Sequence, residues 1–117
     1  MPKKNNYQIF IEEIYKWVDR LGLRDWDVQI TNEPYEEDTN CVATTSGDGP
    51  QRMLEFNLNK SCKAPGSIEL AAAHEAFEGL LWPTRELLRR YYSEDVTNEN
   101  IHRIIAVWTN LIRTLYP

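Results

Sequence analysis

The chain carries the sequence SIELAAAHEAFEGLLWP at residues 67–83. Ser67 is a favourable helix N-cap, and Pro83 is expected to end the helix one or two residues earlier. Apolar side chains recur at positions 70, 77 and 81, at helical spacing, which predicts that one face of this helix lies on a core. His74 falls on the same face, so the sequence predicts an imidazole within a buried stripe.

The sequence before this helix predicts one helix and three strands. Residues 7–21 place apolar side chains at helical spacing, with charged side chains on the opposite side. Residues 26–30 alternate between apolar and polar side chains, as in a half-buried strand. Residues 41–45 and 53–58 flank the turn-rich segment 47–50, and we expect them to pair as a β-hairpin.

Two further helices are predicted after Pro83. A short one spans residues 85–92, and the last begins near Thr97 or Asn98. One face of the last helix is apolar and is expected to be buried, and it comprises Ile101, Ile104, Ile105, Trp108, Leu111, Ile112 and Leu115. This order of elements predicts a single α+β domain over residues 1–117, with helices on one face of a small three-stranded antiparallel sheet.

The composition bears on location and partners. The 117 residues are 42% hydrophobic, enough for one packed core, and the formal net charge of −5 argues against a nucleic-acid partner. No apolar run approaches the ~20 residues that span a bilayer, and no signal-peptide core follows the N-terminus, so we expect no membrane partner and a cytoplasmic location. Cys41 and Cys62 lack CxxC spacing and are expected to be reduced thiols, with a disulfide or a metal-ligand role for Cys62 as alternatives.

The chemistry-bearing residues of the chain are His74, Glu75 and Glu78. At about 100° per residue, Glu78 lies roughly 40° from His74 around the helix and Glu75 roughly 100° away. An imidazole and a carboxylate one turn apart can coordinate one metal ion, and Glu75 could then act as a general base toward water. The alternative is a core histidine with solvated glutamates. Burying a carboxylate beside an imidazole, however, costs several kcal/mol unless a metal or another cation compensates.

Residues 70–83, LAAAHEAFEGLLWP, resemble the HExxH-bearing helix of small, minimal zincin-type metallopeptidases, especially short ones encoded by phages and prophages. Residues 98–104, NENIHRI, are similar to the later helix on which such proteins carry an acidic third ligand. Residues 26–28 and 52–59 fit the first strand and the edge strand beside the motif helix. The resemblance covers nearly the whole chain, and its specific motif is the short helix.

The resemblance implies a metal-dependent peptidase in which His74 and Glu78 are the first two metal ligands, Glu75 the general base and Glu99 the third ligand. Glu78 stands where the family has a second histidine. One imidazole and two carboxylates would accept Mn²⁺ or another oxygen-preferring ion as well as Zn²⁺. The substrate is expected to be a peptide or protein, aligned along the strand at residues 54–58. The alternative is a phage-derived binding or inhibitor protein that keeps the fold without catalysis.

The third ligand stays open between two residues. Glu99 lies roughly 160° from the centre of the apolar stripe at Ile101, so it could reach the site only from a projecting first turn. His102, about 100° off the stripe, would partly replace the missing imidazole. Glu75 and Glu78 together with these two residues also permit a two-metal carboxylate site. An oligomeric protein that uses its Trp-rich helices as an interface is a further alternative.

Two sets of side chains have ordinary structural interpretations. The aromatic side chains near the predicted site are expected in the core, with a substrate groove as the alternative, and they are Trp82, Tyr91, Tyr92 and Trp108. A basic set is expected to form a solvated helix face, with carboxylate or phosphate binding as the alternative, and it comprises Arg85, Arg89 and Arg90.

Overall fold

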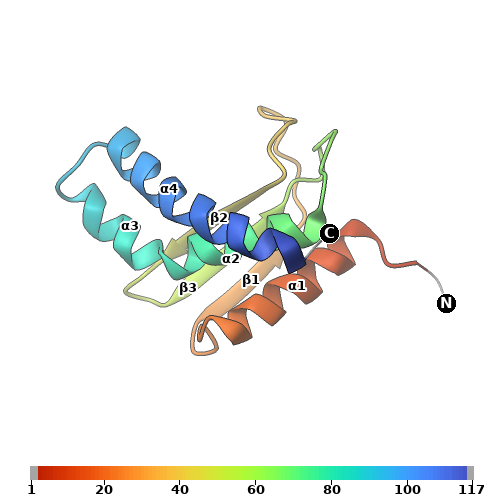
Figure 1. Ribbon diagram of the computed structural model, residues 1–117, viewed down its shortest axis with the longest axis horizontal. Coiled ribbons are helices and arrows are strands. Elements are labelled where there is room, and N and C mark those ends of the chain that lie inside the picture. The colour runs from red at the N-terminus through yellow and green to blue at the C-terminus, as the bar shows by residue number, and fades with distance from the viewer. Residues whose placement is uncertain (1–2, 116–117) are drawn as a thin grey trace.

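Helices and strands follow one another in an α+β fold, which confirms the predicted class (Figure 1). The structure, a computed structural model, describes residues 3–115 without the side chain of Leu115, so this member of the predicted stripe lies outside the described side chains. The elements are α1 (Asn6–Arg20), β1 (Asp27–Thr31), β2 (Ala43–Asp48), β3 (Met53–Leu58), α2 (Ile68–Leu80), α3 (Trp82–Arg89), α4 (Glu94–Ile112) and a short 3-10 turn (Arg113–Leu115).

Serine caps set where the two long C-terminal helices begin. Ser67 Oγ accepts a hydrogen bond from the Leu70 backbone N–H at 3.2 Å, so α2 begins where the sequence predicts. Ser93 Oγ accepts one from Val96 N–H in the same way, and α4 therefore begins at Glu94, earlier than predicted. The acidic residues of the first turn of α4 also stabilise its N-terminus.

The three strands form a mixed sheet in the order β1-β3-β2. β2 and β3 pair as the predicted antiparallel hairpin, whereas β1 pairs with β3 in parallel, with Val28 opposite Leu54. The sheet therefore departs from the wholly antiparallel arrangement that we expected. β1 and β2 follow each other in the sequence but are not neighbours in the sheet, because β3 lies between them. β3 is thus the central strand instead of the predicted edge strand, and β2 is an edge.

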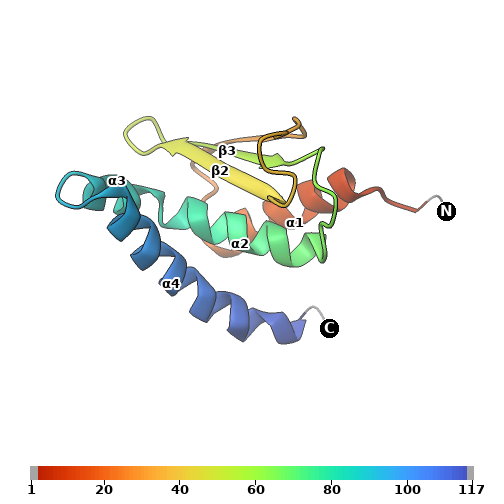
Figure 2. The same cartoon turned by 90° about the horizontal axis from the view of Figure 1, so that it is seen from above.

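The core lies between one face of the sheet and the helices α1 and α2 (Figure 2). Phe10 and Ile14 of α1 pack in one buried cluster with Leu54 and Phe56 of β3. Gly79 lets α2 approach the sheet, since a Cβ at this position would lie only 2.9 Å from Phe56 Cζ. This close approach fixes the height of α2 above the sheet.

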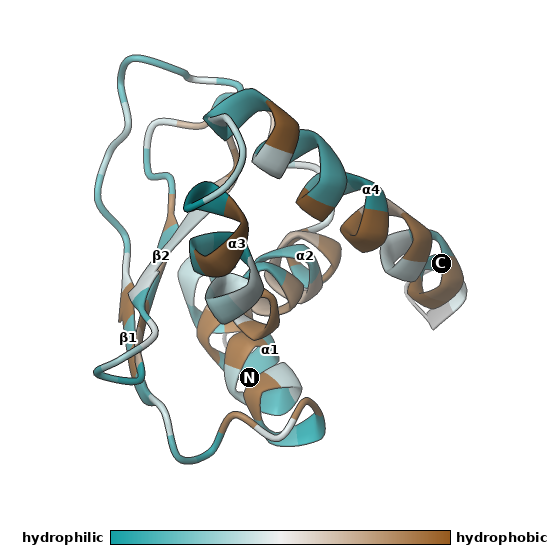
Figure 3. Cartoon of the chain, turned by 90° about the vertical axis from the view of Figure 1, so that its left-hand side faces the viewer, coloured by the Kyte–Doolittle hydropathy of each residue, from teal (hydrophilic) through white to brown (hydrophobic). Residues whose placement is uncertain are grey.

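α4 packs on α2 through only part of its apolar face. Ile101 and Ile105 are fully buried in a cluster with Phe77, as predicted, and Ile112 is partly buried against it, whereas Ile104 is exposed. The exposed apolar side chains of the C-terminal half of α4 are Val107, Trp108 and Leu111. Figures 2 and 3 show that the C-terminal half of α4 diverges from the other helices, although Trp108 still stacks on Phe77 of α2, with ring centroids 6.0 Å apart, and Ile112 still packs against the cluster.

The predicted burial of the aromatic side chains and the predicted bounds of the short helix are confirmed only in part. Trp82 is buried as predicted, but Tyr91 and Tyr92 are exposed because α3 ends at Arg89 and they lie in the turn that follows.

α3 begins at Trp82, earlier than predicted. Pro83 is compatible with the first turn of a helix, so it ends α2 and also stands at the start of α3. Among the described residues, no helix combines the length and the apolar content needed to cross a bilayer.

Candidate metal centre

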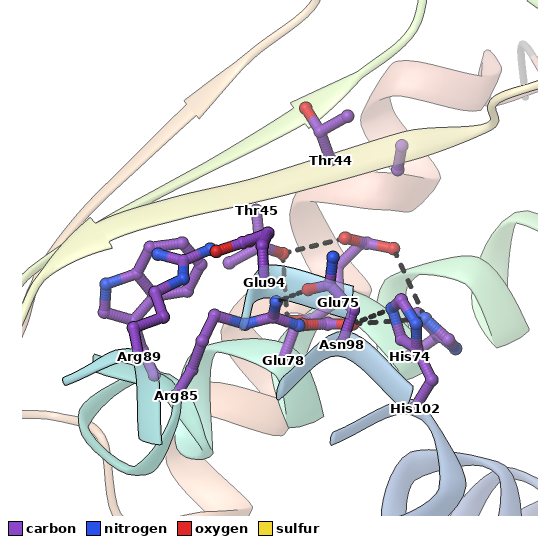
Figure 4. A pocket seen from close by; sticks show the side chains of 12 residues that line it. Thr44, Thr45, His74, Glu75, Glu78, Arg85, Arg89, Glu94, Asn98 and His102 are labelled. Carbon is purple, nitrogen blue, oxygen red and sulfur yellow. Dashed lines mark hydrogen bonds and ion pairs between the residues drawn. The ribbon is translucent and has the colours of Figure 1, made fainter. Parts of the chain in front are cut away.

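Three side chains with metal-ligating atoms meet where α2 and α4 pack together (Figure 4). They are His74 and Glu78 of α2 and His102 of α4, and their ligand atoms all lie within 4.8 Å of one another. Glu78 Oε1 is 2.8 Å from His102 Nε2 and 3.8 Å from His74 Nε2. The carboxylate oxygen therefore lies between two imidazoles that come from different helices.

Helical geometry explains this meeting. His74 and Glu78 are one turn apart on α2, so they project in nearly the same direction. On α4, Ile101 and Ile105 seat the helix against α2, and His102 follows Ile101 at about 100° around the axis. His102 therefore projects from the side of α4 next to Ile101 and Ile105 and reaches Glu78. This is the position that the alternative with His102 as the third ligand predicts.

Glu99, the other predicted third ligand, lies apart from this cluster. Its side chain is 69% exposed, and its Oε1 is 3.5 Å from Nη2 of Arg103 on the same helix. The cluster consequently contains two imidazoles and one carboxylate, in contrast to the one imidazole and two carboxylates that the resemblance implied.

Burial within the cluster differs from the sequence expectation at His74, which the apolar stripe predicts to be buried. The side chain of His74 is 37% exposed and that of His102 is 55% exposed, whereas Glu75 and Glu78 are buried. Alanine and phenylalanine side chains make the buried faces of α2, which leaves His74 at the rim of a cavity. The imidazoles therefore stand at the entrance of the site and the carboxylates form its floor.

A buried cation compensates the charge of Glu78. Arg85 Nη2 donates a hydrogen bond to Glu78 Oε2 at 2.7 Å, and both residues are more than 90% buried. Arg85 Nη1 also donates to Asn98 Oδ1 of α4. Arg85 is thus not part of a solvated basic face as predicted, although Arg89 and Arg90 are exposed. Its partner offsets part of the desolvation cost of a buried carboxylate.

Glu75 is a second buried carboxyl group beside the cluster. Thr45 Oγ1 of β2 donates to Glu75 Oε1 at 2.8 Å, and Glu75 Oε2 lies 4.0 Å from His74 Nε2. Burial raises the pKa of Glu75 to about 8, although the Thr45 hydrogen bond opposes the rise. Burial also lowers the pKa of His74, against the opposing charge of Glu78, so the neutral imidazole that binds metals is favoured.

Two cavities adjoin the cluster. The first, of about 290 Å³, is lined by His74, Glu75, Glu78 and His102 and extends along Thr45 toward Trp82 and Arg89. The second, of about 360 Å³, shares His74 and Glu75 and reaches Val42 and Leu70. Ala43, the first residue of the edge strand β2, borders both cavities, and Thr44 and Thr45 line the first one.

Sequence reasoning missed Thr45 and Asn98, which shape the site, and gave Arg85 carboxylate binding only as the alternative to a solvated helix face. Asn98 carried a usable signal, because it precedes His102 by one helical turn and so lies on the same flank of α4. Thr45 carried none, since its contact with Glu75 depends on the placement of β2.

The residues present fit a divalent metal ion. Two imidazoles and one carboxylate form a donor set of catalytic zinc sites, which keep a further position open. The observation that supports the fit is the position of Glu78 Oε1, which lies within 3.8 Å of both Nε2 atoms. The richer nitrogen content favours Zn²⁺ over Mn²⁺ more than the set implied by the resemblance does.

Comparisons with known proteins add little to this geometry. The chain matches no protein-family model and no curated protein. A solved structure similar to it is the metallopeptidase zymogen of Methanocaldococcus jannaschii jannalysin, at 18% identity and a TM-score of 0.42, over 91% of this chain and 96% of that one. This likeness is too remote to support a function for this chain. Any functional proposal therefore rests on the geometry of the site.

Proposed function

We propose that this chain is a zincin-like, metal-dependent peptidase whose divalent ion, Zn²⁺ in preference to Mn²⁺, is held by His74, Glu78 and His102. The observation that carries the proposal is the approach of three ligand atoms from α2 and α4 to within 4.8 Å of one another, beside a buried carboxyl group. The resemblance of residues 70–83 to an HExxH helix supports it. When bound, the ion would polarise a peptide carbonyl and lower the pKa of water.

Glu75 is the proposed proton acceptor. Its pKa of about 8 means that Glu75 mostly holds a proton at neutral pH in the ion-free chain. A positive charge within about 4–6 Å favours the carboxylate form, so Glu75 becomes a competent base only when the site is charged. Thr45 fixes Glu75 Oε1, which leaves Oε2, on the His74 side, to exchange the proton.

The substrate is proposed to be an extended peptide paired with β2. β2, instead of the predicted strand at residues 54–58, is the edge of the sheet beside α2, so its outer backbone groups can pair with another strand. Ala43, Thr44 and Thr45 of β2 line the first cavity together with the metal centre. A peptide paired there would run directly past His74 and Glu75.

The test combines metal content with hydrolysis. Purified protein loaded with Zn²⁺ should hold one ion per chain by elemental analysis and should cleave peptides from a mixed library. Glu75→Gln should keep the ion and lose hydrolysis by about 10²–10⁴-fold, the usual contribution of a general base. Glu99→Gln, at an exposed position outside the cluster, is the matched control and should keep both.

Two outcomes would reject the peptidase proposal. One is ion content well below one per chain under every loading condition. The other is hydrolysis that survives unchanged in Glu75→Gln, which would exclude Glu75 as the base.

A second candidate is a non-catalytic binding protein that retains the same fold. One observation favours it: Arg85 Nη2 and His102 Nε2 lie 2.7 and 2.8 Å from the two oxygens of Glu78, so protein side chains already give this buried carboxylate partners. On this view the natural protein binds Zn²⁺ poorly, and Glu78→His creates or strengthens binding. Tight one-to-one binding by the natural protein would remove the reason for this candidate.

A further inference from the structure

We propose that Arg85 and Asn98 act as positioning residues that hold Glu78 as a one-oxygen metal ligand, so that the seating of α4 sets the geometry of the metal centre. This inference rests on the proposed metal centre and deepens it. Three helices supply the parts, since Glu78 lies on α2, Arg85 on α3 and Asn98 on α4.

The first step of the argument is that the two oxygens of Glu78 have different partners. Oε2 accepts the hydrogen bond from Arg85 Nη2 at 2.7 Å, whereas Oε1 faces His102 Nε2 at 2.8 Å and His74 Nε2 at 3.8 Å. A carboxylate whose Oε2 is engaged by a guanidinium offers only Oε1 to an ion. One-oxygen binding leaves more of the ion's coordination positions open for substrate and water.

The second step is that Arg85 is itself held in place. Its side chain is buried, and its guanidinium lies 5.7 Å from the ring centroid of Trp82. The guanidinium is a rigid planar fork, and its Nη1 donates to Asn98 Oδ1 while Nη2 donates to Glu78. Figure 4 shows Arg85 reaching from α3 toward these two side chains.

The third step is the spacing of Asn98 and His102. They are four residues apart on α4 and therefore project from the same flank, one turn from each other. His102 contacts Glu78 Oε1 directly, and Asn98 contacts Oε2 through Arg85. A shift of α4 would consequently disturb the partners of both oxygens at once.

The experiment uses the full chain and Co²⁺ alone as the probe, because the visible absorption of Co²⁺ reports its coordination number. Asn98→Ala removes the acceptor for Arg85 and leaves the three proposed ligands in place. Loss of an outer partner of a metal ligand typically costs 10–100-fold in affinity. We therefore expect Asn98→Ala to bind Co²⁺ about 10-fold or more weakly, with weaker visible bands as Glu78 supplies its second oxygen.

Two matched variants separate positioning from general damage. Asn100→Ala removes a neighbouring amide on α4 that donates to Val96 O of the same helix, and it should bind Co²⁺ as the natural chain does. Asn98→Asp keeps an acceptor oxygen for Arg85 and should restore most of the affinity and the natural spectrum. A merely structural role for Asn98 would not produce the spectral change.

The outcomes are distinguishable. If the natural chain takes up no Co²⁺ or Zn²⁺, the proposed function fails and this inference fails with it. If the natural chain binds Co²⁺ and Asn98→Ala binds it with the same affinity and spectrum, only the positioning role is overturned. Should Asn98→Ala fail to fold, Arg85→Lys replaces it, since one ammonium cannot form the same fork, and unchanged binding by that variant overturns the role equally.

Discussion

Glu75 makes the stability of the ion-free chain depend on pH in an unusual direction. Its folded-state pKa of about 8 exceeds the ordinary value of 4.5, so between these values the folded chain holds a proton that the unfolded chain releases. The stabilisation is fully present below pH 4.5 and is lost as the pH rises through 8. We expect the free energy of unfolding to fall across this window by at most about 1.4 kcal/mol per pH unit.

Urea unfolding of the chelator-treated protein at several pH values between 5 and 8 measures this dependence, with Glu75→Gln as the comparison. His74 acts in the opposite direction, because its pKa is lowered and its contribution grows as the pH rises toward 6.5. Subtracting the Glu75→Gln profile cancels most of the His74 contribution, since both proteins contain that residue. Parallel profiles for the two proteins would show that Glu75 has an ordinary pKa.

At the scale of elements, α2 depends on its close contact with the sheet. Gly79→Ala would improve helix propensity by about 1 kcal/mol in an exposed helix. Here the new Cβ would lie 2.9 Å from Phe56 Cζ and 3.1 Å from Leu54 Cδ1, so packing should cost about 1–3 kcal/mol. We expect a net loss of stability and a lower Tm by calorimetry. A higher Tm would mean that α2 does not approach β3 this closely.

The seating of α4 gives a paired prediction. Ile105 is fully buried against α2, while its neighbour Ile104 is exposed. Ile105→Ala should cost about 2–5 kcal/mol in the free energy of unfolding, as buried large-to-small changes do. Ile104→Ala should cost less than about 0.5 kcal/mol, as is usual for exposed positions. Equal losses in denaturant unfolding would contradict this orientation of α4.

The sequence predicts most elements of the fold but not all of their partners. Alternation at residues 53–58 shows which side chains of β3 face the core, yet it does not show that β1 lies beside β3 in parallel. That pairing depends on the path of the β1–β2 connection, which has no periodic signal. The caps at Ser67 and Ser93 depend only on neighbouring residues, so the sequence carries them. The predicted start of α4 at Thr97 or Asn98 is too late, because it follows the first apolar residues of the stripe instead of the cap at Ser93.

At the scale of the whole molecule, the proposed ion joins α2 to α4. Anything that binds only the folded chain stabilises it, by about 2.7 kcal/mol at a ligand concentration 100 times the Kd. Zn²⁺ should therefore raise the Tm of the natural protein in a concentration-dependent manner and should do little for His102→Ala. Glu99→Gln is the control and should respond to Zn²⁺ like the natural chain. An equal rise in His102→Ala would place the ion elsewhere.

As with the fold, the parts of the site that depend on local spacing along one helix could be predicted from the sequence. His74, Glu75 and Glu78 lie within two turns of one helix, so spacing alone brings them together. His102 is separated from Glu78 by a corner and a second helix, so the sequence could offer it only as an alternative to Glu99. The helical phase favoured His102, since Glu99 faces almost directly away from the buried seam. The burial of Arg85 depends on three helices and has no local signature.

The most direct measurement is anomalous X-ray diffraction from crystals of the full chain soaked in Zn²⁺. The proposed function predicts one zinc peak at about 2.0–2.2 Å from His74 Nε2, Glu78 Oε1 and His102 Nε2, with Glu99 remaining in solvent. A peak bound elsewhere, or an imidazole–carboxylate cluster that stays metal-free at saturating Zn²⁺, would contradict it.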